Sequence, residues 1–436
     1  MEGYIVSLII FTATFALFGL GLNLQWGYTG LINFGHVAFM AVGAYTTTLL
    51  SLSGVPLILA TVLGAGLAAA LGLLIGLSTL RLREDYLAIV TIGVSEMLRL
   101  VAVNEEWLTR GTFGIQRFPL PLATLNPRLP VRVGMVMVLT LVVGLGFWQV
   151  WVWLQQRLKG VPRQAITTSS LAMLGYLGSL GLLLYGVGVG ASQLKISDLP
   201  DWALGLGLLI TVIGIGWVYL WLGDRVLSQL PGATAGLAVA SGAFCLVFGV
   251  WIYRFAASAL YHYSRNPSKT GLMFLSVLLV AIVFWALQRL VRSPWGRVLK
   301  AIREDEEVAK ALGKPVFWYK LQSLMLGGFI AGLAGALYAW QLTTVYPDNF
   351  RPQITFNAWT IVVLGGAGNN VGTLLGAALF LTYENLTRFV LQDIIPLSDS
   401  QLGAFRIMVI GLLLMVLMVW RPQGILGKKE ELTLGR

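Results

Sequence analysis

The most restrictive feature of this sequence is a long run without charge near its N-terminal end. From Gly3 to Leu80 the chain has no Asp, Glu, Lys or Arg. An apolar helix of about 20 residues crosses a bilayer, and this run is long enough for three such helices. Only 11% of the whole chain is charged and 57% is hydrophobic, whereas roughly a quarter of a soluble protein is charged. These proportions exclude a soluble globular enzyme and predict an all-α, polytopic transmembrane helical bundle.

Apolar segments of spanning length recur along the chain. The region 354–391 differs because glycines and asparagines at 365–370 interrupt it, and it predicts either a re-entrant segment or two short crossings. We therefore expect about 11–13 membrane segments, including broken or re-entrant helices, within a single transmembrane domain over 1–436. The uninterrupted segments lie at 4–24, 31–51, 55–79, 86–103, 131–154, 166–190, 202–223, 232–253, 271–290, 321–342 and 402–420.

The basic residues predict the topology. The net charge of +11 comes from residues that gather in short loops, as the positive-inside rule describes for cytoplasmic loops. Basic clusters at 81–83, 157–163 and 289–320 follow the third, fifth and ninth segments, which agrees with an N-terminus outside. An even number of passes through 354–391 then places the C-terminus in the cytoplasm. The charge thus orients the chain in the lipid bilayer, and we expect no nucleic-acid partner.

The sequence offers little for catalysis or metal binding. Cys245 is the single cysteine, and the two histidines, His36 and His262, lack the spacing of a metal site or a catalytic set. Residues 312–316 (LGKPV) lack the upstream glycine and the following Ser or Thr of a phosphate-binding loop. We therefore expect no catalytic residue, no cofactor and no metal, and conclude that the chain is not itself an enzyme.

An ion-coupled secondary transporter is the alternative from another functional class. Such proteins usually place carboxylates in the middle of the membrane, and here only Glu96 and Glu384 lie near that depth. Arg99 follows Glu96 by three residues, so an ion pair on the helix surface is as good an interpretation as an ion site. The residues alone leave both open.

The loop 293–320 predicts a short amphipathic cytoplasmic helix. Pro294 suits its first turn and Gly313 its end. The loop is either a solvated interfacial helix or a docking element for a cytoplasmic motor domain. We expect the following residues to pack against the protein: Val298, Ile302, Val308 and Leu312. We expect the following to face outward: Arg303, Glu304, Asp305 and Glu307.

Two stretches share a plan of glycine turn, asparagine and apolar helix. They are residues 27–45 and 365–380. Interrupted helices in membrane proteins often mark a pathway, because the N-terminus of a half-helix can face a substrate carboxylate. The alternative is close helix packing with satisfied polar groups. The candidate pathway residues are Asn33, Phe34, His36, Asn369 and Asn370.

Two loops predicted outside are rich in proline and turn residues, at 104–130 and 343–355. They are candidate docking surfaces for an external partner, and ordinary solvated connections are the alternative.

Five segments together resemble the LivM family of permease subunits in ABC importers for branched-chain and other hydrophobic amino acids. The size and the Trp-rich part at 131–253 are similar to those of cyanobacterial neutral amino acid permeases, and 131–253 looks like a set of extra helices inserted into the shorter family pattern. The segments that carry the resemblance are LGLNLQWGYTGLINFGHVAFMAVGAYTTTLL, RLREDYLAIVTIGVSEMLRL, WGRVLKAIREDEEVAKALG, VVLGGAGNNVGTLLGAAL and RPQGILG.

This resemblance implies a set of partners and a location. They are a LivH-like second permease subunit, two cytoplasmic ABC ATPase subunits and a periplasmic amino-acid-binding protein, in the bacterial inner membrane. It also implies that 293–320 is the segment that couples to the ATPase. A urea or short-amide permease is the nearest alternative, because urea permeases share this family's sequence plan. The implied coupling residues are Arg303, Glu304, Asp305, Glu307 and Gly313.

Overall fold

The structure is a computed structural model of the 436-residue chain. It describes residues 2–80, 84–123, 125–159, 233–394 and 424–427, with isolated positions between 161 and 215 and between 403 and 415. Within these residues the secondary structure is almost entirely helical, and the strands form one sheet of two short strands. The all-α prediction is therefore confirmed.

Six described helices are long and apolar enough to span a bilayer, or seven if one bent pair counts as a span. Their sequences are apolar with few charged residues, and a helix satisfies its own backbone polar groups where lipid offers no partner. The predicted segments at 166–190, 202–223 and 402–420 lie almost wholly outside the described residues. The six are Glu2–Tyr28, Leu57–Thr79, Tyr86–Asn104, Leu129–Val152, Pro267–Arg292 and Val316–Leu342.

The chain divides into two compact units. The first contains residues 1–136, 258–382 and 411–436, and the second contains 137–257 and 383–410. In the second unit, α6 (Leu129–Leu158) and α9 (Ala233–Tyr261) meet through a 2.6 Å hydrogen bond between the hydroxyls of Thr140 and Tyr253. Whether 131–253 is an insertion remains a prediction.

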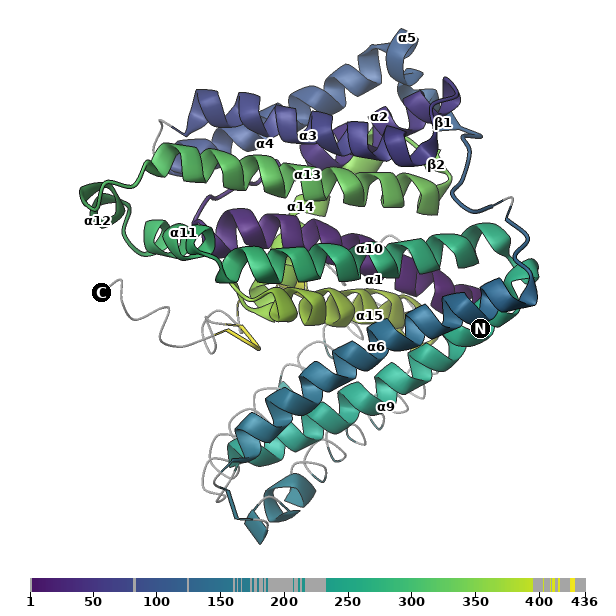
Figure 1. Cartoon of the computed structure of the whole chain (residues 1–436), viewed down its shortest axis with the longest axis vertical. Coiled ribbons are helices and arrows are strands. Elements are labelled where there is room, and N and C mark those ends of the chain that lie inside the picture. The colour runs from purple at the N-terminus through teal and green to yellow at the C-terminus, as the bar shows by residue number, and fades with distance from the viewer. Residues whose placement is uncertain are drawn as a thin grey trace. The chain divides into compact units, whose positions relative to one another are not determined.

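The core of the first unit forms around α13 (Val316–Leu342), which packs against α1 (Glu2–Leu22), α2 (Val37–Leu52) and α3 (Leu57–Thr79) (Figure 1). Small residues allow this approach. A Cβ added to Gly43 would lie 2.2 Å from the carbonyl oxygen of Gly332, so the two helix backbones are in direct contact. Such small-residue contacts are the usual means by which helices associate in lipid.

Two helical spans of the first unit are interrupted. After α1 the chain forms a π-helix, η1 (Asn23–Tyr28), and then an irregular segment before α2 begins. In the second case α14 (Gln353–Gly365) and α15 (Asn370–Ile394) are separated by the turn 366–369, and the two arms are bent by 118°. Both glycine-rich stretches thus break a helix, as their sequence predicts.

The two loops predicted outside are joined by a small sheet. Strand β1 (Ile115–Gln116) pairs antiparallel with β2 (Thr344–Val345), in the register Ile115 opposite Val345. Short helical turns flank the strands. These are α5 (Glu106–Thr109), η2 (Gly111–Phe113) and η5 (Pro347–Phe350).

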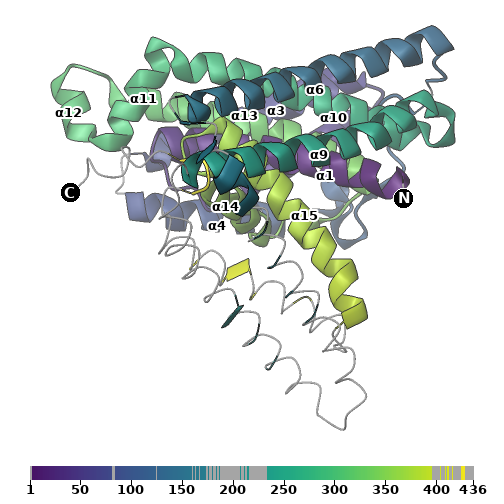
Figure 2. The same ribbon diagram turned by 90° about the horizontal axis from the view of Figure 1, so that it is seen from below.

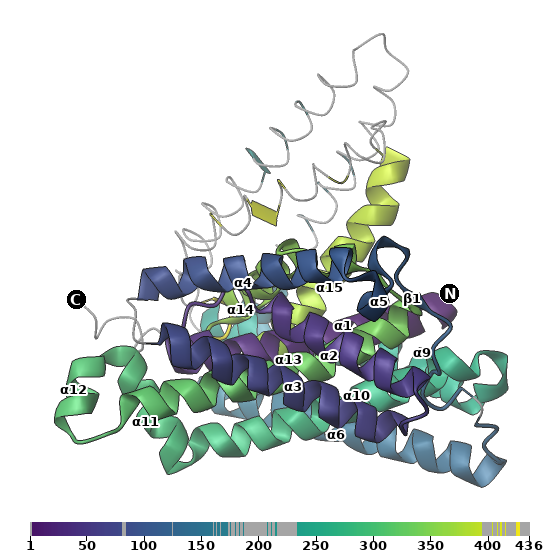
Figure 3. The ribbon, with the colours of Figure 1, turned by 90° about the horizontal axis from the view of Figure 1, so that it is seen from above.

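The other end of the first unit carries a helical hairpin. Helix α10 (Pro267–Arg292) leads into α11 (Pro294–Glu304) and α12 (Glu306–Ala311). Figures 1, 2 and 3 agree that α11 and α12 lie at the opposite end of α1 from its N-terminus, and Figures 1 and 3 show the β1–β2 sheet at that N-terminal end. The predicted cytoplasmic and outer segments are therefore separated by the length of the spans.

Candidate functional site

The first interrupted span carries several amide side chains away from solvent. Asn23, Gln25 and Asn33 are each at most 1% exposed, in a chain section with no charge. Burying an amide is costly unless its donors and acceptors find partners. π-helical turns, which need an extra residue in the helix, occur frequently at functional sites. The candidate site is therefore built from η1 and the segment that follows it.

Asn33 is held by contacts within this segment. Its Nδ2 donates to Oε1 of Gln25 at 2.9 Å, and its Oδ1 accepts from the backbone N–H of Gly35 at 2.9 Å. Gln25 in turn donates to the carbonyl of Leu324 on α13 at 3.1 Å. The sequence did not single out Gln25. An amide residue within a long apolar run could have marked it as a candidate.

The second interrupted span meets the first through Asn370. This side chain is 1% exposed, accepts from Nδ2 of Asn23 at 3.1 Å, and donates to Oε1 of Gln288 at 3.1 Å. Asn23 also accepts from the backbone N–H of Gly368 at 2.9 Å. The two stretches singled out from the sequence also meet, because a Cβ added to Gly27 would lie 2.5 Å from the backbone nitrogen of Gly368. Asn23 and Gln288 complete a buried amide cluster that the sequence did not reveal.

Asn369 has a different environment from its neighbour. Its Oδ1 accepts from the backbone N–H groups of Val371 and Gly372 at 3.0 and 3.2 Å, which caps the start of α15. Its Nδ2 donates to the carbonyl of Leu426 at 2.8 Å. Of the two adjacent asparagines, Asn370 joins the amide cluster and Asn369 fixes the turn.

An aromatic cluster borders the amides. The ring of Phe34 lies 5.0 Å from that of Trp359 and 5.6 Å from that of Phe356, and Trp26 lies 4.4 Å from Trp359. The indole N–H of Trp359 donates to the carbonyl of Asn33 at 3.1 Å. Phe356 keeps 44% of its surface exposed. The amide and aromatic groups therefore lie side by side, and the ring of Phe356 at the edge of the cluster is partly exposed.

His36 lies deeper, between α1 and α2. It is fully buried, its Nε2 is 3.2 Å from the carbonyl oxygen of Phe18, and the two rings are 4.7 Å apart. Its Nδ1 has no hydrogen-bond partner among the described residues. His36 thus packs against α1 and makes no hydrogen bond to the amide cluster among the described residues.

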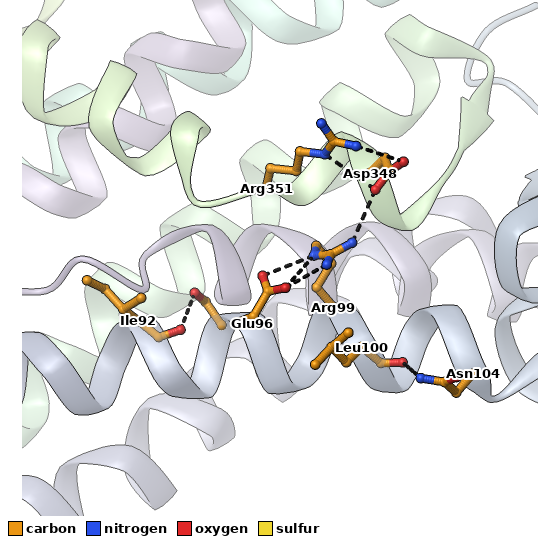
Figure 4. A network of polar contacts seen from close by, with 8 residues as sticks. Ile92, Glu96, Arg99, Leu100, Asn104, Asp348 and Arg351 are labelled. Atoms are coloured by element: carbon orange, nitrogen blue, oxygen red, sulfur yellow. Dashed lines mark hydrogen bonds and ion pairs between the residues drawn. The ribbon is translucent and has the colours of Figure 1, made fainter.

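Figure 4 shows the ion pairs around Glu96. Arg99 lies 2.6 Å from Glu96 on α4 (Glu84–Asn104) and 3.1 Å from Asp348 on η5, and Arg351 lies 3.1 Å from the same carboxylate. The ion-pair interpretation of Glu96 is therefore the one that the structure supports. The same contacts connect α4 to the segment that precedes α14.

The predicted amphipathic helix is two helices. Asp305 has extended backbone angles and its Oδ1 accepts from the N–H groups of Glu307 and Val308 at 2.9 and 3.0 Å. A side chain that caps a new helix competes with continuing the old one. The prediction that Val308 and Leu312 pack inward is wrong, because they are 55% and 71% exposed. The break at Asp305 turns the residues after it away from the face that they would have occupied in one continuous helix.

The buried side of the hairpin consists of a small apolar cluster and an ion pair. Ile302 and Ala309 form a cluster with Val316, against which Val298 packs. Glu306, which the sequence did not single out, pairs with Lys320 on α13. Partial burial of Glu306 acts to raise its pKa, but Lys320 and Lys310 outweigh it and hold the pKa below its usual range.

The five expected coupling residues do not share one role. Glu304 and Glu307 are exposed, as predicted, and Gly313 ends the hairpin with φ of +73°. Arg303 is not directed outward, because its guanidinium donates to the backbone carbonyl of Gly27 in η1. That bond joins positions 276 residues apart, and no local pattern predicts it.

Comparisons with known proteins give a consistent answer. A family model described as branched-chain amino acid transport system / permease component matches residues 4–155 and 164–418. The high-affinity branched-chain amino acid transport system permease proteins LivM of Salmonella typhimurium and Escherichia coli are each 26% identical over 97% of this chain and 69% of the relative. The xylose transport system permease protein XylH of Escherichia coli is 25% identical over 68% of this chain and 70% of the relative. No solved structure matches.

Proposed function

Because this chain belongs to the family of permease components of branched-chain amino acid transport systems, we propose that it is a membrane-spanning subunit of an ABC importer for branched-chain and other neutral apolar amino acids. The observation that carries the substrate class is the contact between the two interrupted helices. There a buried amide cluster adjoins aromatic rings.

The chemistry of this junction suits a zwitterion with an apolar side chain. Amides donate and accept hydrogen bonds without adding a net charge, and the N-terminus of α15 at Asn370 favours a carboxylate. Rings of Phe34, Phe356 and Trp359 offer an apolar surface to the side chain. Among the described residues no group of acids, histidines and cysteines could hold a metal ion. We assign Asn33, Phe34 and Asn370 to the pathway.

We assign the two ends of the first unit to different partners. The α11–α12 hairpin within 293–320 would contact one of two cytoplasmic ABC ATPases. The β1–β2 sheet, beside which Trp107 and Phe113 are 81% and 74% exposed, would contact a periplasmic amino-acid-binding protein. This assignment corresponds to an N-terminus outside and a C-terminus in the cytoplasm of the inner membrane. A LivH-like second permease subunit would complete the pathway.

The test is transport by the assembled complex. The full chain is reconstituted in vesicles with its partner permease, ATPases and binding protein, and uptake of labelled leucine is measured against excess alanine, glutamine, urea and xylose. We expect ATP-dependent uptake that apolar amino acids inhibit. Inhibition by urea or xylose alone would move the substrate class to short amides or sugars. Uptake by the isolated chain without ATPase would indicate a secondary transporter.

A further inference from the structure

We propose that Arg303 is a positioning residue that transmits movement of α11 to the π-helical turn at the amide cluster. This inference rests on the proposed function, because it describes how the ATPase end of the permease would act on the pathway. It concerns the region where α11 contacts η1 directly.

Two basic side chains of α11 reach the same turn. Arg303 donates to the carbonyl of Gly27, and Lys300, three residues earlier and on the same helix face, has its ammonium 5.7 Å from the ring centre of Tyr28. The backbone of Gly30 lies against Arg303, because a Cβ added there would be 3.5 Å from its Cγ. One face of α11 thus contacts this part of the chain at three positions, two at the end of η1 and one just after it.

The carbonyl of Gly27 is a suitable place for such a contact. Carbonyls at the end of a helix lack the next turn's N–H groups and need other partners. The preceding carbonyls of Gln25 and Trp26 accept from Leu31 and Gly30 at 2.9 Å each. For Gly27 the partner is a guanidinium, and a bond from a charged donor is stronger than one from a neutral donor.

The same turn also contacts the second interrupted span. A Cβ at Gly27 would lie 2.5 Å from the backbone nitrogen of Gly368, in the turn between α14 and α15. Asn23, one helical turn before Gly27, bonds both Gly368 and Asn370. The π-helical turn therefore contacts α11 through Gly27, the second interrupted span through Asn23 and Gly27, and α13 through Gln25. A shift of α11 must either carry the turn with it or break the Arg303 bond.

The hairpin is fastened to the first turns of α13, so a movement of α11 would involve α12 and these turns as well. Ile302 and Ala309 share a buried cluster with Val316, and Glu306 pairs with Lys320. Glu304 and Glu307 lie on the exposed side, where Glu307 pairs with Lys310. A push on that side would reach η1 through the hydrogen bond of Arg303, beside the looser contact of Lys300 with Tyr28.

The test compares three variants in the full complex. Arg303→Gln removes the charge and most of the donors, Arg303→Lys keeps a charged donor, and Arg297→Gln makes the same charge change at an exposed position of α11. A reporter cysteine replaces Phe34 in a Cys245→Ser background. Its labelling by an impermeant maleimide is measured without nucleotide and with ATP bound. The number of substrate molecules imported per ATP hydrolysed is measured separately in the same three variants with Phe34 intact, because Phe34 is itself assigned to the pathway.

We expect the labelling to differ between the two nucleotide states in the parent and in Arg297→Gln. In Arg303→Gln the difference is lost and import per ATP falls about fivefold or more, the lower end of coupling between two sites, while ATP hydrolysis persists. Arg303→Lys recovers part of both. A merely structural role would change assembly and leave the nucleotide dependence of the labelling intact.

Two results would overturn this inference. One is an Arg303→Gln complex with the parent's labelling difference and import per ATP. The other is that the Arg303→Gln chain does not assemble at all, while the Arg303→Lys complex assembles and has fully parental coupling. Arg303 would then be an assembly residue. Failure of the proposed function looks different, because then the parent complex itself shows no ATP-driven amino acid import.

Discussion

At the scale of single residues, the buried amides determine how the two interrupted spans fit together. Asn370→Ala removes the acceptor of Asn23 and the donor to Gln288. We expect a loss of about 1–3 kcal/mol, because buried polar groups are left without partners. Thermal unfolding of the purified chain in detergent measures this.

The matched control is Asn104→Ala, which removes an exposed bond from the side chain to the carbonyl of Leu100 on its own helix. Its expected effect is within about 0.5 kcal/mol. The double variant Asn23→Ala, Asn370→Ala is expected to lose less than the sum of the single losses, because contacting residues are not additive. Full additivity would show that the two amides do not act together.

The sequence anticipated some of these residues and missed others for a physical reason. Asn33 and Asn370 follow glycine turns, so a local signal marked them. Asn23 and Gln288 lie within helices and acquire their role only through partners far along the chain. Arg303 was predicted outward because helix periodicity describes a face of a helix and not the reach of a long side chain.

At the scale of elements, the α11–α12 hairpin depends on how its helices begin and end. Pro294 and Gly313 marked its two ends correctly. The break at Asp305 was missed because acidic residues in a run with good helix formers also suit a continuous helix. An N-cap residue is defined by its non-helical backbone angles, and the residue pattern alone does not specify these angles.

Asp305→Ala is expected to destabilise α12 by about 1 kcal/mol, whereas Asp305→Ser retains a capping oxygen. Limited proteolysis within 300–315, followed by mass spectrometry, measures the opening of the hairpin. Faster cleavage of the Ala variant than of the Ser variant is the expected result. Equal cleavage of both, faster than that of the parent, would mean that the charge of Asp305 matters and its cap does not, and parental cleavage of both would mean that neither matters.

Gly313→Val forces a branched side chain into a left-handed backbone conformation, φ +73°. A Cβ at this position meets nothing within 4 Å, so the expected cost of about 1–2 kcal/mol is backbone strain alone. Gly313→Asn is the control, because Asn tolerates this conformation. Co-purification of the ATPase is expected to fall for Val and to persist for Asn. A parental yield of ATPase with the Val variant would contradict this.

At the scale of the whole molecule, the separation of the two ends gives a test of topology. In a Cys245→Ser background, cysteines placed within 296–312 are expected to react only from the cytoplasm and those within 115–123 only from outside. The reason is the basic cluster at 289–320. Impermeant maleimide applied to intact cells and to inverted vesicles measures this. Reaction of both sets from one side would contradict the odd number of crossings predicted between them.

The proposed insertion is tested by its removal. Replacing 131–253 by a short linker is expected to preserve membrane insertion and pairing with the second permease, because an even number of crossings returns the chain to the same side. Co-purification with the partner permease and residual uptake measure this. Loss of pairing with insertion retained would assign 131–253 to the subunit interface.

The small sheet between β1 and β2 also bears on how the chain is made. Ile115 pairs with Val345, so the ribosome must synthesise the chain from one strand to the other before either strand has its partner. At about 5–20 residues per second this takes roughly ten seconds or longer. Throughout that interval the segment after α4 lacks its β partner. This end of the first unit is therefore completed only after α13 has been synthesised, and until then β1 is open to proteases and chaperones.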